Sequence, residues 1–144
     1  MKILVINGPN LNMLGIREPE IYGSATYQDL VDIIQREADT MGVEVSFYQS
    51  NHEGDLVDAI QQAYGKIDGI VINPAAYTHT SIAILDALKA VALPAIEVHL
   101  SDIKERESFR HISYPAMACI AQVKGKGFDG YEEAILMLKE RLQK

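Results

Sequence analysis

The sequence predicts an α/β protein in which helices cover both faces of a five-stranded parallel sheet. Two observations lead to this prediction. Short apolar runs alternate with amphipathic stretches five times along the 144 residues, and strands separated by helices pair in parallel through right-handed crossovers. The apolar fraction of 48% also suffices for one buried core. We therefore expect residues 1–144 to form one domain with a three-layer, doubly wound architecture.

The first two strands differ in their hydrophobic pattern. Residues 3–6 are continuously apolar, which is typical of a strand buried on both faces. Thr26 and Asp29 have the spacing of a capping box, and Gly42 is a suitable terminator, so a helix is expected between them. Residues 43–47 alternate between apolar and polar, which predicts a strand at an edge of the sheet with one face in solvent.

The remaining elements follow the same two patterns. Further strands are expected at residues 69–72, 95–98 and 118–123, and further helices at 55–64, at 81–91 and from about 131 onward. Thr80 is a candidate N-cap for the helix over 81–91. Five strand–helix units in this length fit the flavodoxin-like strand order 2-1-3-4-5.

Composition excludes several classes of function. The longest apolar runs are far shorter than the ~20 residues that cross a bilayer, and the chain opens directly on a strand rather than on a secretory signal, so we expect a cytoplasmic protein. The single cysteine, Cys119, excludes a disulfide framework and a multi-thiolate metal site. A net charge of −7 argues against nucleic acid as a partner.

Ligands of doubly wound sheets bind beyond the carboxyl ends of the strands. The relevant segments are residues 7–23, 73–80 and 99–111. The first is much longer than the usual ~2–6 residue β–α connection, so residues 8–23 are interpreted as an active-site lid. This segment contains Asn10, Arg17 and Tyr22 but no phosphate-binding glycine motif, which argues against a nucleotide or flavin there. Turn formation and a solvated Arg–Tyr pair remain alternatives.

The clearest chemical signal comes from the fourth strand and the segment after it. Period-2 alternation places Glu97 and His99 on one side of that strand. A carboxylate beside an imidazole fixes its tautomer and raises its basicity, as a catalytic histidine requires, although a buried structural pair is also possible. Arg106 and Arg110, four residues apart, would share one face of a helical turn and could bind an anion or form a solvated stripe.

Other histidines carry weaker signals. His79 follows the third strand and Asn73, but loop histidines are often merely exposed. His52 and His111 are interpreted as structural or exposed. With four scattered histidines and one cysteine, no metal site is predicted.

Together these segments resemble a known family. The motifs are Asn7-Gly8-Pro9-Asn10-Leu11-Asn12, residues 17–23 (REPEIYG), residues 73–81 (NPAAYTHTS), residues 97–101 (EVHLS) and residues 106–114 (RESFRHISY). In this order, over nearly the whole chain, they resemble type II 3-dehydroquinate dehydratases. The resemblance implies dehydration of 3-dehydroquinate to 3-dehydroshikimate by anti elimination through an enolate, without a cofactor. It also implies a flavodoxin-like homo-oligomer, a dodecamer of four trimers.

The resemblance also implies a role for each matching residue. Tyr22 would remove a proton from C2, with Arg17 and Arg106 lowering its pKa. Asn10 would hold a water that stabilises the enolate oxygen.

On the other side of the substrate, His99 would protonate the leaving C1 hydroxyl, oriented by Glu97. The implied substrate-binding groups are Asn73, Leu100 and Ser101 for the carboxylate, His79 and Arg110 for the ring hydroxyls, and Asp86 from a neighbouring subunit.

A few positions depart from the family pattern. Asp102 stands where the family commonly has Asn, and its charge is expected to point away from the carboxylate site. Pro115-Ala116 and residues 123–128 also differ, without touching the implied acid or base. Three alternatives remain on sequence alone: a flavin carrier, a receiver domain, and a catalytically inactive homologue. The implied reaction serves aromatic biosynthesis as well as quinate breakdown.

Overall fold

The computed structural model describes residues 1–16, 20 and 23–144. Its centre is a five-stranded, wholly parallel sheet with the order β2-β1-β3-β4-β5. The strands are β1 (Lys2–Asn7), β2 (Glu44–Gln49), β3 (Gly69–Asn73), β4 (Ala95–His99) and β5 (Ala121–Lys124). The predicted flavodoxin-like order is therefore confirmed.

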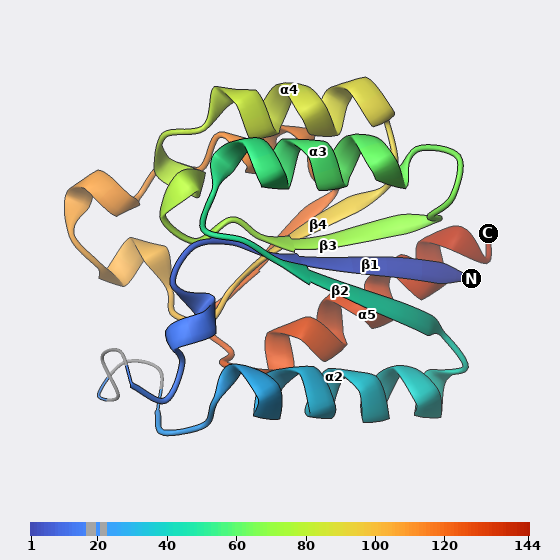
Figure 1. The fold of residues 1–144 in the computed structure, drawn as a ribbon, viewed down its shortest axis with the longest axis horizontal. Coiled ribbons are helices and arrows are strands. Elements are labelled where there is room, and N and C mark those ends of the chain that lie inside the picture. Colours follow the sequence, from blue (N-terminus) through green and yellow to red (C-terminus); the bar gives the residue numbers. More distant parts are fainter. Residues whose placement is uncertain (17–19, 21–22) are drawn as a thin grey trace.

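Helices cover both faces of the sheet. The helices are α2 (Tyr27–Met41), α3 (Glu53–Ala63), α4 (Ile82–Val91) and α5 (Asp129–Leu142). Figure 1 shows α3 and α4 above the sheet and α2 and α5 below it. Each layer has its own apolar core: Leu30, Ile34, Ile135 and Leu138 lie in the lower one, and Leu56, Ile60, Ile84 and Leu88 in the upper one.

The predicted boundaries of α2 are confirmed by its capping contacts. The Thr26 hydroxyl accepts a hydrogen bond from the amide of Asp29 (3.1 Å), and the Asp29 carboxylate accepts one from the amide of Thr26 (2.9 Å). Gly42 ends α2 in the left-handed conformation. Strand β2 is at the edge and alternates in exposure, as predicted.

Two local predictions are wrong. Thr80 does not cap α4; the Ser81 hydroxyl accepts the hydrogen bond from the amide of Ile84 (2.9 Å). The last strand begins at Ala121 rather than 118, because Pro115–Ala118 form a 3₁₀ helix. Proline at the first position of that helix has the backbone angle that a helical turn needs and no amide to satisfy.

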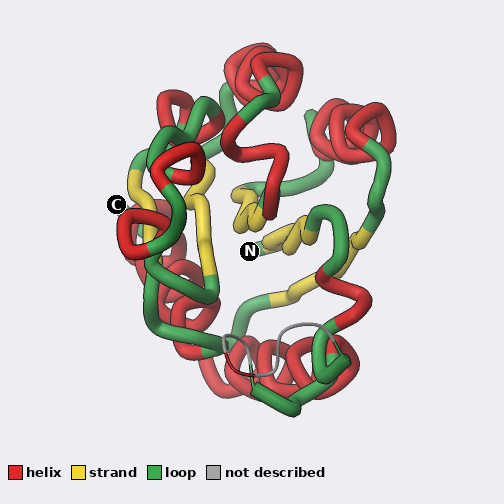
Figure 2. The backbone as a smooth tube through the Cα atoms, turned by 90° about the vertical axis from the view of Figure 1, so that its left-hand side faces the viewer, coloured by secondary structure: helices red, strands yellow, loops and turns green. Residues whose placement is uncertain are grey.

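The carboxyl ends of the strands are tied together closely. The amide of Gly8 donates to the carbonyl of Asn73 (2.8 Å), and a Cβ at Gly8 would lie only 2.5 Å from the carbonyl oxygen of Pro74. Only glycine fits such a contact. Figure 2 looks onto this end of the sheet, where the loops and short helices gather. Among the described residues, no helix has the length and apolarity to cross a membrane.

Candidate active site

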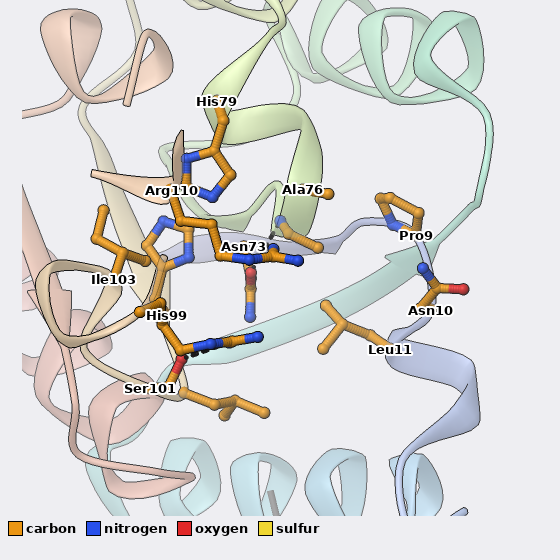
Figure 3. A pocket seen from close by; sticks show the side chains of 13 residues that line it. Pro9, Asn10, Leu11, Asn73, Ala76, His79, His99, Ser101, Ile103 and Arg110 are labelled. Carbon is orange, nitrogen blue, oxygen red and sulfur yellow. Dashed lines mark hydrogen bonds between the residues drawn. The ribbon is translucent and has the colours of Figure 1, made fainter. Parts of the chain in front are cut away.

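A pocket opens where β1, β3 and β4 end, and loops from three parts of the chain line it (Figure 3). Pro9 and Leu11 lie opposite His99 across the cavity. Most of the predicted site residues line this pocket: Asn10, Asn73, His79, His99, Leu100, Ser101, Arg106 and Arg110. A second hollow lies between α3 and the strands β1 and β2, and none of the predicted site residues lines it.

His99 lies at the floor of the pocket, with Glu97 buried behind it. Their side chains lie on the same side of β4, as predicted, with Nε2 of His99 3.1 Å from Oε2 of Glu97. Glu97 is completely buried and His99 is 6% exposed. Because His99 lines the pocket and Glu97 lies behind it, only the imidazole can meet a ligand.

The Glu97 carboxylate has three further hydrogen-bond donors that the sequence did not reveal. Oε1 accepts from the hydroxyls of Thr78 (2.9 Å) and Ser113 (2.7 Å), and Oε2 accepts from the Gln122 side-chain amide. Burial alone would raise the pKa of Glu97, but hydrogen bonds from His99, Ser113 and Gln122 outweigh it and hold the pKa below its usual value. Only the register of β4 against β5, which sets Gln122 beside Glu97, could have identified that partner.

Asn73 is anchored from inside the protein. Its Nδ2 donates to the Tyr131 hydroxyl (3.0 Å), and its Oδ1 accepts from the amide of Ala75 (3.0 Å). Tyr131 in turn donates to Oδ1 of Asn7 (2.6 Å). Burial raises the pKa of Tyr131, so this hydroxyl stays neutral. Ala75 has a positive φ of 53°, a strained conformation that the Asn73 side chain helps to hold beside the pocket.

The two arginines come from separate turns rather than from one helical turn, so that prediction is wrong. Ile103–Glu105 and Ser108–Arg110 are distinct 3₁₀ helices, yet both guanidinium groups reach the pocket. Nη1 of Arg106 donates to the Ser101 hydroxyl (3.2 Å), and Nε of Arg110 donates to Glu107 (2.8 Å). These contacts place two positive charges at the rim.

Two further predicted residues complete the lining. Asn10 adopts the left-handed conformation (φ 71°), and its backbone amide donates to Oδ1 of Asn51 (3.0 Å). Nδ1 of His79 lies 2.8 Å from the carbonyl oxygen of Ile112. Burial lowers the pKa of His79, which favours a neutral imidazole.

Some predicted site residues are not brought to this pocket. Arg17 and Tyr22 lie outside the described residues. Asp86 is exposed on α4 and does not line the pocket, so its contribution to a neighbouring subunit stays a prediction. Asp102 accepts from the amide of Lys104 (2.9 Å) and is not part of the lining, as expected for a charge directed away from the site.

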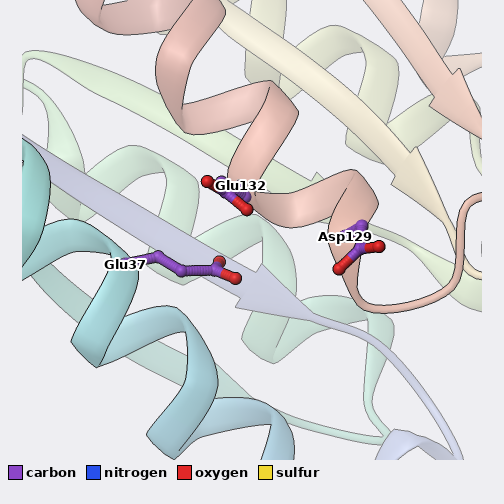
Figure 4. A group of neighbouring side chains, drawn as sticks. All are labelled: Glu37, Asp129 and Glu132. Carbon is purple, nitrogen blue, oxygen red and sulfur yellow. The ribbon is translucent and has the colours of Figure 1, made fainter.

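One group of carboxylates has the spacing of a metal site. Among the described residues, Glu37 on α2 and Asp129 and Glu132 on α5 bring carboxylate oxygens within 4.8 Å of one another (Figure 4). Burial and the neighbouring Glu132 raise the pKa of Glu37 to about 7. None of the three residues lines the pocket.

Comparison with known proteins decides the family. The sequence model of the family Dehydroquinase class II matches residues 1–139. The chain belongs to the class II dehydroquinase family. Members of this family dehydrate 3-dehydroquinate in the shikimate pathway. The match sets aside the flavin-carrier and receiver alternatives.

Individual relatives match over their full lengths. The 3-dehydroquinate dehydratase of Clostridium acetobutylicum is 56% identical over 144 residues, which is 100% of both chains. That of Caldicellulosiruptor bescii is 57% identical over 142 residues, 98% of both. The crystal structure of the type II dehydroquinase of Butyrivibrio crossotus has a TM-score of 0.95 at 56% identity and covers 96% of this chain and 97% of its own.

Proposed function

We propose that this chain catalyses the cofactor-free anti dehydration of 3-dehydroquinate to 3-dehydroshikimate through an enolate. The observation that carries the proposal is the buried Glu97–His99 pair at the floor of a pocket whose rim bears two arginines. The pair supplies a proton donor, and the arginines suit an anionic substrate. The family match supports the same reaction.

His99 would serve as the acid. Its Nε2 faces Glu97, so Nδ1 is the ring nitrogen left to protonate the departing C1 hydroxyl. The carboxylate stabilises the imidazolium that donates this proton, and the hydroxyl leaves as water. Thr78 lies 3.4 Å from the same Nε2 and restrains the ring further.

Tyr22 would remove the C2 proton, with Arg17 and Arg106 as its activators. A free tyrosine has a pKa of ~10, so work near neutral pH needs a decrease of about 3 units, or ~4 kcal/mol. One unit charge at ~4 Å in an effective dielectric of ~20 supplies ~4 kcal/mol. Desolvation opposes this decrease, so two guanidinium groups are better than one. Closure of the lid at residues 8–23 would bring the base to the substrate.

The other lining residues would bind the substrate. Asn73 has a second Nδ2 proton beyond the one given to Tyr131, and it would meet the substrate carboxylate with the backbone of Leu100 and Ser101. His79 and Arg110 would hold ring hydroxyls, and Asn10 the water at the enolate oxygen.

The proposal includes a cytoplasmic homododecamer of four trimers. The exposed position of Asp86 on α4 supports its contribution to a neighbour's site, because an exposed side chain can contact another subunit. Sedimentation of the purified protein tests the assembly, and a monomer with full activity would contradict it.

The decisive experiment adds 3-dehydroquinate and follows the ultraviolet absorbance of the conjugated product.

Tyr22→Phe should lose nearly all turnover while still binding substrate, because only the proton acceptor is removed. Arg17→Lys should also lose most of its turnover, since an ammonium does not replace a planar guanidinium. A Tyr22→Phe protein with a tenth of wild-type activity would remove Tyr22 as the base, and an inactive wild type would point to a catalytically inactive homologue.

A further inference from the structure

We propose that Thr78, Ser113 and Gln122 are positioning residues of the reaction, which keep Glu97 a carboxylate and aim it at Nε2 of His99. The inference deepens the proposed function and rests on it for the role of His99. The set joins η2 (Ala75–His79), the segment before η5 (Pro115–Ala118) and β5 around one carboxylate on β4.

The three side chains direct hydrogen-bond donors at Glu97 from different sides. Ser113 donates to both carboxylate oxygens, at 2.7 and 2.9 Å from Oε1 and Oε2. Its own oxygen accepts from the amide of Ala116 (3.2 Å), which fixes the direction in which the hydroxyl proton points. Thr78 donates to Oε1, and the Gln122 amide donates to Oε2.

This arrangement suits an anion and not a neutral acid. A protonated Glu97 would place a hydroxyl proton among groups that already point their own protons at it, and at least one hydrogen bond would be lost. Complete burial makes such a loss costly. The donor set therefore selects the charged form of Glu97.

The surrounding ionisable groups do not disturb this selection. Among the described residues, those that face Glu97 are His99 on its own strand, His79 at the end of η2 and Cys119 after η5. Burial and the charge of Glu97 raise the pKa of Cys119 to about 12, so the thiol stays neutral. Burial lowers the pKa of His79 and keeps that ring neutral near pH 7.

The consequence for His99 is a fixed ring. A permanent carboxylate at Oε2 holds a proton on Nε2, which leaves Nδ1 as the nitrogen that exchanges a proton with the substrate. If Glu97 became protonated, the ring would lose its orienting acceptor. Catalysis should therefore decline as pH falls through the pKa of Glu97, and weakening the donor set should move that decline to higher pH.

Titration of the intact enzyme by NMR tests the proposal. The ¹³C shift of the Glu97 carboxyl and the ¹⁵N shifts of the His99 ring are followed in wild type, Ser113→Ala and Gln122→Met. We expect wild-type Glu97 to titrate below the ordinary ~4.3 of a glutamate. Each variant should raise the pKa of Glu97 on the order of one unit and move the acidic limb of kcat by the same amount.

Two further variants keep the test sharp. Ser113→Thr retains the hydroxyl and should restore the wild-type profile. Gln28→Met removes an amide that donates to the exposed carboxylate of Asp32 (2.8 Å) and should change neither titration nor profile. The proposal is overturned by a wild-type Glu97 that titrates at or above the ordinary value, or by variants that leave the acidic limb unmoved. An inactive wild type would instead reject the proposed function. The Glu97 titration would still show whether the three donors keep Glu97 charged.

Discussion

Glu97 and Glu37 are the same side chain in opposite surroundings. Glu97 is enclosed by donors from three other elements, and its pKa is lowered. Glu37 faces Glu132 and Asp129, and its pKa is raised to about 7. Oε2 of Glu37 is buried without a hydrogen-bond partner among the described residues. A proton shared with Glu132 would satisfy it.

The two glutamates differ in which protonation state the fold stabilises and in whether a pocket lies beside them. At the end of β4 the fold stabilises an anion, and that anion lies behind a histidine in a pocket. Between α2 and α5 the fold stabilises a protonated carboxyl, and none of Glu37, Asp129 and Glu132 lines the pocket that contains His99. A cluster of acidic residues is therefore a weaker sign of catalysis in this chain than a single acid with many donors.

The largest expected effect comes from removing the negative charge of Glu97 behind His99. Glu97→Gln should lower kcat by ~10²–10⁴-fold, the usual contribution of a general acid. The variant lacks the negative charge, and its NH2 group would direct protons at donors that need an acceptor. Steady-state kinetics measure it, with circular dichroism to confirm folding. Glu37→Gln is the matched control and should leave kcat unchanged. A decrease of less than tenfold for Glu97→Gln would show that the charge of Glu97 is dispensable.

The next largest effect is expected from the uncharged hydrogen bonds that join Asn7, Tyr131 and Asn73. Tyr131→Phe removes the hydroxyl between Asn7 and Asn73, so that Oδ1 of Asn7 and Nδ2 of Asn73 each lose the hydrogen bond to Tyr131. We expect a loss of about 1–3 kcal/mol in the free energy of unfolding and a raised KM, because Asn73 loses its anchor. Urea unfolding and substrate titration measure the two effects. An unchanged KM would show that Tyr131 does not position Asn73.

Glu37→Gln should change stability in a pH-dependent way. The raised pKa means that the folded state holds a proton that the unfolded chain has released, so this contribution is complete below ~4.3 and is lost as pH rises through about 7. The variant should match wild type near pH 4 and exceed its stability at pH 8. Urea midpoints at both pH values check this, with Glu140→Gln on the exposed face of α5 as control. Equal slopes against pH in wild type and variant would contradict it.

The smallest effect is expected from Asp129→Asn. The charge of Asp129 raises the pKa of Glu37 less than that of Glu132 does. Removing it should lower the pKa of Glu37 slightly toward its ordinary value. Asp129 also lies in the first turn of α5, where a negative charge is favourable. The two effects oppose each other in stability, so NMR titration of Glu37 is the readout, and an unchanged or raised pKa would contradict the prediction.

The parts of the fold that depend on local patterns were predictable. Alternation of strands and helices predicted the sheet order, and period-2 geometry placed Glu97 beside His99. The capping box at Thr26 needed only four residues of sequence, from Thr26 to Asp29. Thr80 and Ser81 show the limit, since two adjacent hydroxyl residues both suit a helix start and η2 decides between them.

The missed parts depend on contacts between distant residues. Gln122 reaches Glu97 because β5 pairs with β4 in one register, which tertiary packing determines. Arg106 and Arg110 converge from two 3₁₀ turns, although their spacing fits one helical turn. Tyr131 meets Asn7 across 124 residues of sequence. No local periodicity encodes such pairs.

The bond from Tyr131 to Asn7 also constrains when the protein can become active. Because the chain is synthesised from its amino terminus, β1, β3 and β4 emerge from the ribosome before α5 does. A nascent chain that ends before residue 131 already contains His99 but not the hydroxyl that anchors Asn73. Competence for substrate should therefore arrive late, with the docking of the final helix.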